Sequence, residues 1–173
     1  MTSVLEVIDR GQHLAFSFED LMRYHGPGSP GGVAHAYKVL ERALPLLAPG
    51  SLCERREIVV ETAFGGPGAR DAFELVTRAV SGDRFHVQAG LARPERGRAL
   101  ERFVFRLGYR ERVMTLELRD GFVTDEFIDL ARTEPRGADE ERRLDVLKRE
   151  MADRVMARPA SEVYEVGEPG VAA

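Results

Sequence analysis

The chain has 173 residues, of which 31% are charged and 43% hydrophobic, and its formal net charge is −4. This length suits one domain with its own buried core, and the slight acidic excess argues against nucleic-acid binding, which usually requires a basic excess. A single cysteine, Cys53, excludes an intrachain disulfide and a cysteine-rich zinc module. The sequence shows neither a signal-peptide pattern nor the roughly 20 apolar residues of a membrane span. We therefore expect a cytoplasmic protein without a membrane partner.

The first elements are short. Residues 1–16 give only a weak pattern, compatible with a short helix. Ser17 then stands where a helix N-cap is expected and is followed by two acidic residues, so we predict a helix over residues 18–24.

A glycine-rich loop follows this helix. From Tyr24 the chain reads Tyr-His-Gly-Pro-Gly-Ser-Pro-Gly-Gly and then becomes amphipathic. We predict a helix that begins near Gly31 and that Pro45, which has no N–H, kinks or ends early. Apolar residues recur along it at helical spacing: Val33, Tyr37, Leu40, Leu44 and Leu47. The loop places His25 beside a helix start, where unpaired N–H groups carry partial positive charge and glycine allows close approach, which predicts a binding site.

A second glycine-rich loop lies further along the chain. Residues 57–64 are β-branched and predict a buried strand, and residues 69–80 predict a helix. Between them, Gly65–Gly68 could present backbone amides to an anion, with Arg70 nearby. We favour a plain tight turn, because the Lys-Ser/Thr pair of a P-loop is missing.

The remaining elements predict the fold class. In order, we expect a strand at 84–89, an exposed arginine-rich loop at 90–100, paired strands at 103–105 and 113–118, a helix capped by Thr124, a helix at 139–157, a strand at 163–166 and a frayed tail at 167–173. Because the later strands follow one another directly, the pattern favours an α+β fold with a mainly antiparallel sheet over a doubly wound parallel sheet.

Several stretches, in this order, resemble the FmdE-like family, which takes its name from a component of formylmethanofuran dehydrogenase. The family motif His-Gly-His-x-Cys-Pro-Gly corresponds to His25–Gly31, its strand with an acidic residue to Ile58–Thr62, and its Asp-Ala helix to Asp71–Ala79. Two family strands correspond to Phe103–Arg106 and Arg112–Leu118. The resemblance implies helices packed on a mixed, mainly antiparallel sheet, and a homodimer. Residues 1–135 would form the family domain, to which residues 136–173 add a C-terminal helix and a short strand.

The chain departs from this family at every cysteine. Pro27 replaces the second histidine and Ser29 the first cysteine, while the other cysteine positions fall within Gly65–Gly68 and near Ala79. The thiolates that could hold a soft metal are therefore missing. The resemblance implies an accessory or binding protein that has lost the cysteine chemistry.

Three functions stay open. The first is a binding protein that holds a small molecule or metal between the His25 loop and the Glu61–Gly68 loop. Its candidate ligand-binding residues are His25, Gly28, Ser29, Gly31, Glu61, Gly65, Gly66 and Arg70. The second is a metal-assisted hydrolase or lyase in which His25 and His35 bind zinc or iron and Glu61 acts as a base. The third is a structural dimer or a component of a larger complex.

Other reactive residue types receive structural interpretations. Ser29 could be a nucleophile with His25 as its base, but no Gly-x-Ser-x-Gly motif is present and we favour a helix cap. We expect His13 and His86 to be structural and Cys53 to be inert. The mixed run Glu54–Glu57 and the arginines at 93–98 predict solvated surface.

Overall fold

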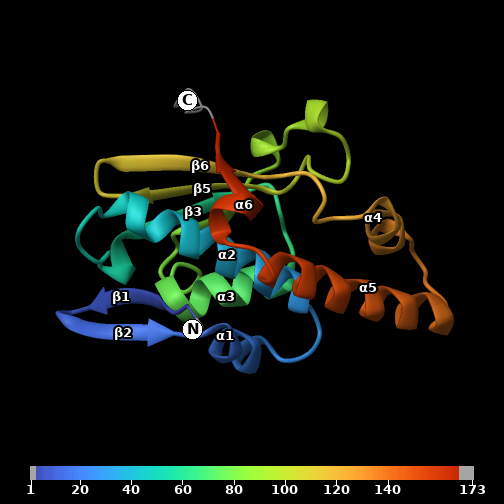
Figure 1. Cartoon of the computed structure of the whole chain (residues 1–173), viewed down its shortest axis with the longest axis horizontal. Coiled ribbons are helices and arrows are strands. Elements are labelled where there is room, and N and C mark those ends of the chain that lie inside the picture. Colours follow the sequence, from blue (N-terminus) through green and yellow to red (C-terminus); the bar gives the residue numbers. More distant parts are fainter. Residues whose placement is uncertain (1–2, 168–173) are drawn as a thin grey trace.

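The computed structural model describes residues 3–167, which form an α+β fold (Figure 1). Its five-stranded sheet has the order β4-β3-β5-β6-β7. The strands are β3 (Ile58–Thr62), β4 (Phe85–Val87), β5 (Val104–Tyr109), β6 (Arg112–Leu118) and β7 (Tyr164–Val166). β3 and β4 are parallel, whereas the other neighbouring pairs are antiparallel. The predicted mixed, mainly antiparallel sheet is confirmed.

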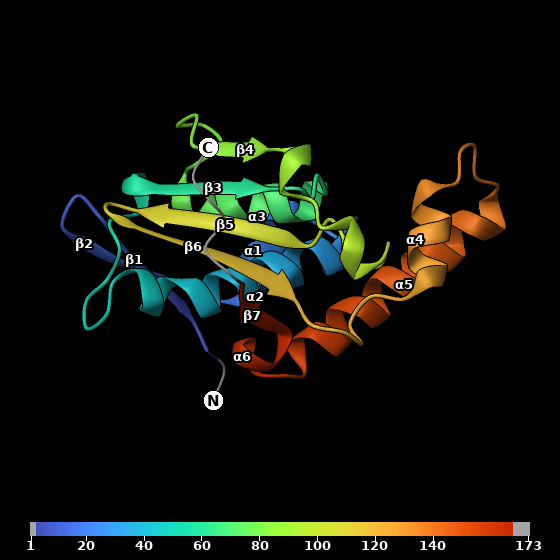
Figure 2. The same ribbon diagram turned by 90° about the horizontal axis from the view of Figure 1, so that it is seen from above.

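The helices cover one face of this sheet. They are α1 (Phe18–His25), α2 (Pro30–Leu47), α3 (Pro67–Thr77), α4 (Asp125–Arg132), α5 (Ala138–Met156) and α6 (Ala160–Val163). α2 and α3 lie beneath the sheet, and α1 lies beneath them (Figure 1). α4 and the first half of α5 extend beyond the end of the sheet (Figure 2). We call residues 125–147 the arm.

The expected helix in residues 1–16 is wrong, because the chain forms a hairpin there. β1 (Leu5–Asp9) and β2 (Gln12–Phe16) pair antiparallel. Arg10 and Gly11 both have positive φ angles, 51° and 83°, which suit a two-residue turn between twisted strands. Leu5 and Val7 are buried and therefore follow the strand period of two.

α2 confirms the apolar stripe but not the effect expected of Pro45. Val33, Tyr37 and Leu40 are fully buried. The helix nevertheless continues to Leu47, with Pro45 in its last turn. Pro45 removes the one hydrogen bond that its N–H would have donated to the carbonyl of Glu41, but the helix resumes after it, since the N–H of Ala48 donates to Leu44 O at 3.2 Å.

Glycines at the start of α2 and α3 let three helices meet. A Cβ at Gly31 would lie 2.9 Å from Met151 Sδ of α5, and one at Gly32 would lie 3.0 Å from Ala69 N of α3. A Cβ at Gly68 would collide with the carbonyl oxygen of Ser29. The close approach that the sequence suggested for a ligand is therefore used at these positions for helix packing.

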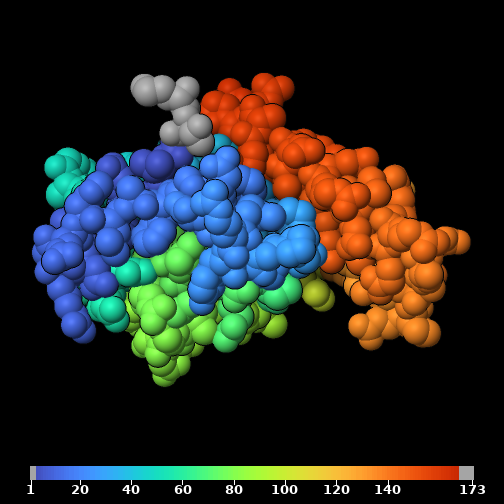
Figure 3. Space-filling model, turned by 90° about the horizontal axis from the view of Figure 1, so that it is seen from below, coloured from blue at the N-terminus to red at the C-terminus, as the bar shows by residue number. Residues whose placement is uncertain are grey.

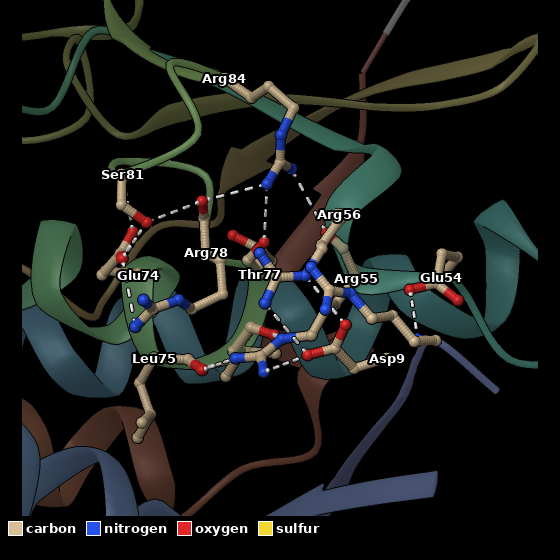
Figure 4. A network of polar contacts seen from close by, with 12 residues as sticks. Asp9, Glu54, Arg55, Arg56, Glu74, Leu75, Thr77, Arg78, Ser81 and Arg84 are labelled. Carbon is tan, nitrogen blue, oxygen red and sulfur yellow. Dashed lines mark hydrogen bonds and ion pairs between the residues drawn. The ribbon is translucent and has the colours of Figure 1, made fainter. Parts of the chain in front are cut away.

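Two arginines close the C-terminal end of α3 (Figure 4). Arg55 Nε donates to Val76 O at 3.0 Å, and Arg84 donates to the carbonyls of Thr77 and Arg78 at 3.1 and 3.0 Å. Arg55 is 7% exposed, and burial lowers its pKa. The prediction that the run Glu54–Glu57 is solvated surface is thus wrong for Arg55.

The sheet face opposite the helices carries the segment predicted as an exposed loop (Figure 2). That prediction holds only in part: the segment is exposed at positions such as Pro94, Glu95 and Arg98, but Leu91 and Leu100 are buried. Two short 3-10 helices shape it, η2 (Ala89–Leu91) and η3 (Pro94–Arg96). Leu91 is buried against Ala63 and Val104. Arg93 and Arg96 form ion pairs with Glu117, and Arg96 also pairs with Glu165.

The C-terminal elements largely follow the prediction. α4 is capped by Thr124, and α5 buries Leu144, Leu147, Met151 and Val155. The last described element is the strand β7 rather than a helix, and the short α6 before it was not predicted. Gly167 N donates to Thr115 O at 2.8 Å, and the rest of the predicted tail lies outside the described residues. Within residues 3–167, no helix has the length and apolar character needed to cross a membrane.

Candidate functional site

A cavity of about 450 Å³ lies where the starts of α2 and α3 meet α4 and α5. The start of α2 contributes Ser29, Gly31 and Gly32, and the loop before α3 together with its first two residues contributes residues 64–68. The two glycine-rich loops that the sequence singled out therefore border the same cavity.

The arm supplies much of the opposite wall. Apolar side chains from α4 and α5 line it: Phe127, Ile128, Ala131, Leu144 and Met151. In Figure 3 the arm, coloured orange, stands out from the N-terminal part of the molecule in blue. The cavity thus lies between the main body and a projecting segment.

All charged side chains that line the cavity are basic. They are Arg98, Arg102, Arg132, Arg136 and Lys148, and no Asp or Glu of the described residues joins them. Three of these cations pair with carboxylates outside the lining: Arg98 with Asp129 at 2.5 Å, Arg132 with Glu101 at 2.7 Å and Arg136 with Glu141 at 2.9 Å. Lys148 Nζ donates to Gly28 O at 3.2 Å. Within residues 3–167, Arg102 forms no ion pair.

Both helix starts at the cavity lack a side-chain cap. Ser29 occupies the N-cap of α2, as predicted, but its hydroxyl makes no capping hydrogen bond. Gly66, the N-cap of α3, has no side chain to offer. The first-turn N–H groups of a helix carry partial positive charge, so the backbone adds to the positive potential of the cavity.

Two stacked aromatic rings line the cavity. The rings of Phe64 and Phe103 stack with their centroids 4.6 Å apart and an interplanar angle of 25°. Phe103 is 2% exposed, whereas Phe64 is only partly buried. The lining of the cavity therefore combines aromatic rings with positively charged side chains.

His25 lies close to this site but does not line the cavity. Its Nδ1 is 2.8 Å from Asp71 Oδ2, and its side chain is 9% exposed. Since the Asp71 carboxylate accepts a hydrogen bond from Nδ1–H, Nε2 is the nitrogen left free, and it is buried without a hydrogen-bond partner among the described residues. No hydrogen bond in that part of the chain joins His25 to Ser29, so the nucleophile–base pair is not formed.

His35 belongs to the core rather than to the site. Its Nδ1 is 2.8 Å from Tyr164 Oη, and its Nε2 is 3.2 Å from Met151 Sδ. Complete burial lowers the pKa of His35 to about 3, so the ring is neutral at pH 7. Both nitrogens are engaged, and residues 3–167 contain no group of three or more His, Cys, Asp or Glu that could hold a metal. His25 and His35 have separate partners, Asp71 for the first and Tyr164 and Met151 for the second, which gives the predicted metal pair no support.

Glu61 lies on the sheet face away from the helices. Ile58 and Val60 belong to the core, so the alternation along β3 directs Glu61 to the other side. There its carboxylate accepts hydrogen bonds from Arg106 at 2.7 and 3.2 Å. This position separates Glu61 from both histidines and excludes it as a base for a metal bound there.

The other predicted residues divide between cavity and surface. Ser29, Gly31, Gly65 and Gly66 line the cavity. Gly28 contributes only its carbonyl to Lys148, and Arg70 is exposed outside the lining. The loop Gly65–Gly68 is extended at Gly66, with φ −67° and ψ 137°, rather than a tight turn.

Three residues interpreted as structural or inert have clear contacts. His13 pairs with Glu6 at 2.9 Å, and His86 lies opposite Glu61 on β4. Cys53 is buried, which raises its thiol pKa to about 11 and leaves it protonated, as expected of an inert cysteine.

The sequence interpretation missed the basic residues of the cavity. Arg98 and Arg102 are four residues apart, and so are Arg132 and Arg136. The first pair precedes β5, and the second begins at the last residue of α4. This is a possible signal, since arginines clustered at element ends can face one site. Nothing in the sequence indicates that the two pairs meet.

Comparisons with known proteins give no indication of function, so the functional conclusion rests on the cavity. No protein-family model matches the chain, and no curated protein matches it significantly. The fold and the cavity define an α+β protein with a basic, partly aromatic cavity beside two helix starts.

Proposed function

We propose that this chain is a small-molecule-binding protein whose ligand occupies the cavity between the starts of α2 and α3 and the arm. The observation that carries the proposal is that two glycine-rich loops and the arm, distant in sequence, meet around about 450 Å³. Small-molecule sites typically have such volumes, with mostly apolar walls and a few polar groups. In this proposal the chain is an FmdE-like accessory or binding protein without the cysteine chemistry of that family.

The other two functions have less support. A metal-assisted hydrolase or lyase would need His25, His35 and Glu61 together, but His35 lies in the core and Glu61 on the far sheet face. A homodimer or a role within a larger complex, and a cytoplasmic location, stay predictions from the sequence.

The proposal can be tested by a fragment screen followed by ¹H–¹⁵N NMR. Fragments should shift the backbone amides of Gly31, Gly32 and Gly65, which line the cavity. Ala131→Trp places a large ring at an exposed position of the lining and should abolish these shifts. Ala138→Trp makes the same change at an exposed position outside the lining and should retain them. Fragments that bind only elsewhere, or equally well to Ala131→Trp, would contradict the proposal.

A further inference from the structure

We propose that the ligand is an organic anion that joins an apolar group, aromatic or aliphatic, to a phosphate or carboxylate. This inference rests on the proposed function and specifies the ligand class of the same cavity. It follows from three properties of the lining: its charge, the helix starts and the stacked aromatic rings.

The charge of the lining is opposite to that of the whole chain. The chain has a net charge of −4, yet the cavity is lined by basic side chains and by no carboxylate of the described residues. The acids that pair with Arg98, Arg132 and Arg136 approach from outside the lining. Arg102, which forms no ion pair within that part of the chain, has its donors available. Guanidinium groups bind phosphate and carboxylate oxygens through paired hydrogen bonds.

The starts of α2 and α3 add partial positive charge to that of the basic side chains. Cations are unfavourable beside the positive N-terminal end of a helix, whereas anions are favourable there. In this cavity Lys148 and the arginines share the lining with Gly31 and Gly68, at the starts of α2 and α3. A bound anion relieves this repulsion, and a neutral ligand does not.

The apolar part of the lining favours a ligand larger than an inorganic anion. Phe64 and Phe103 stack at the cavity, and the arm adds Phe127, Ile128 and Leu144. Phe103, Ile128 and Leu144 are almost fully buried, so the partly buried rings of Phe64 and Phe127 provide the apolar surface that a ligand can cover. A phosphate ion alone would leave this surface in contact with water. An apolar group covers it, and burial of apolar surface contributes favourably to binding.

Isothermal titration calorimetry with four probes tests the inference. 1-Naphthyl phosphate and 1-naphthoate carry both parts, 1-naphthol lacks the anion, and inorganic phosphate lacks the ring. The better of the two naphthyl anions should bind at least tenfold more tightly than 1-naphthol and inorganic phosphate. Which one binds better distinguishes a phosphate from a carboxylate ligand.

Two matched variants assign the anion to the cavity. Arg102→Gln should weaken the better naphthyl anion at least fivefold and leave 1-naphthol unchanged. Arg149→Gln removes the same charge from an exposed position of α5 outside the lining and should change neither.

Four results would overturn the ligand class. The first two are that 1-naphthol, or inorganic phosphate, binds as tightly as the better naphthyl anion. The third is that Arg102→Gln binds this anion as tightly as the wild type. The fourth is that no probe binds, although neutral fragments still bind in the cavity. Each of them leaves small-molecule binding intact. The proposed function itself fails only if the fragments also avoid the cavity.

Discussion

The two ends of α3 carry the same type of side chain with opposite physical consequences. At the C-terminal end, Arg55 and Arg84 donate to the carbonyls of the last turn. At the N-terminal end, Arg98, Arg102 and other basic groups border a cavity beside uncapped backbone amides. Cations stabilise the negative C-terminal end of a helix and oppose the positive N-terminal end. The first cluster is therefore structural, and the second is expected to lower stability unless an anion is bound.

The largest expected effect comes from breaking the C-terminal cluster. Arg55→Met leaves the buried carbonyl of Val76 and the partly buried carbonyl of Leu75 without their donor and removes a partner of Asp9. We expect the free energy of unfolding to fall by about 2–4 kcal/mol, as for buried polar groups left unpaired. Urea unfolding measures this loss.

The matched control is Arg56→Met. Arg56 is 45% exposed and its side chain bonds only to Asp9 among the described residues. Exposed ion pairs contribute little because solvent screens them, so this variant should change the free energy of unfolding much less than Arg55→Met. Equal losses from both variants would show that the carbonyl contacts of Arg55 have no special role.

A smaller effect is expected at the N-terminal end, from the packing of Gly68. In Gly68→Ala the new methyl group meets the Ser29 carbonyl, which is backbone and cannot turn away. Overpacking of this kind costs about 1–3 kcal/mol, measurable by urea unfolding. Gly28→Ala is the control, since its nearest neighbour would be His25 Nε2 at 4.0 Å. If Gly68→Ala is as stable as wild type, the helix starts do not need glycine for packing.

The pH dependence of the free energy of unfolding tests whether His35 is a neutral core residue rather than part of the ligand site. The folded pKa of His35 is about 3, against 6.5 ordinarily. Below pH 6.5 the unfolded chain therefore takes up a proton that the folded chain excludes. His35 should lower the free energy of unfolding by up to about 1.4 kcal/mol per pH unit as the pH falls from 6.5 towards 3.

The difference in slope between wild type and His35→Gln isolates this contribution. As the pH falls from 7 to 5, the free energy of unfolding measured with urea should decrease more steeply for the wild type than for His35→Gln. Parallel slopes would mean that the pKa of His35 is the same in the folded and unfolded chains. Ligand affinity over this range should not follow the titration of His35, because its ring lies in the core.

The elements predicted correctly from the sequence are those in which the spacing of apolar residues indicates which face is buried. The apolar stripe of α2 and the paired strands β5 and β6 are of this kind. The turn at Arg10 and Gly11 was missed because its positive φ angles have no periodic signal. Arg55 was misjudged because its acceptors, Leu75 and Val76, lie about 20 residues away and meet it only after folding.

The candidate site was predictable only where a local sequence pattern marks it. Both glycine-rich loops were recognised locally, and they do meet at the cavity. The opposing wall was not predicted, because Arg132 and Arg136 reach the cavity only through the placement of the arm. Glu61 was misplaced because a carboxylate on a strand gives no indication of which face the other ligands occupy.

The most direct test of the account is Arg102→Gln, measured for stability at low salt and for affinity to 1-naphthyl phosphate. Arg102 is exposed, lines the cavity and makes no ion pair within residues 3–167. Removing a cation that opposes two helix starts should raise the free energy of unfolding by about 0.3–1 kcal/mol, while the affinity for the probe falls. A variant that is less stable than wild type and binds the probe as tightly would contradict the account.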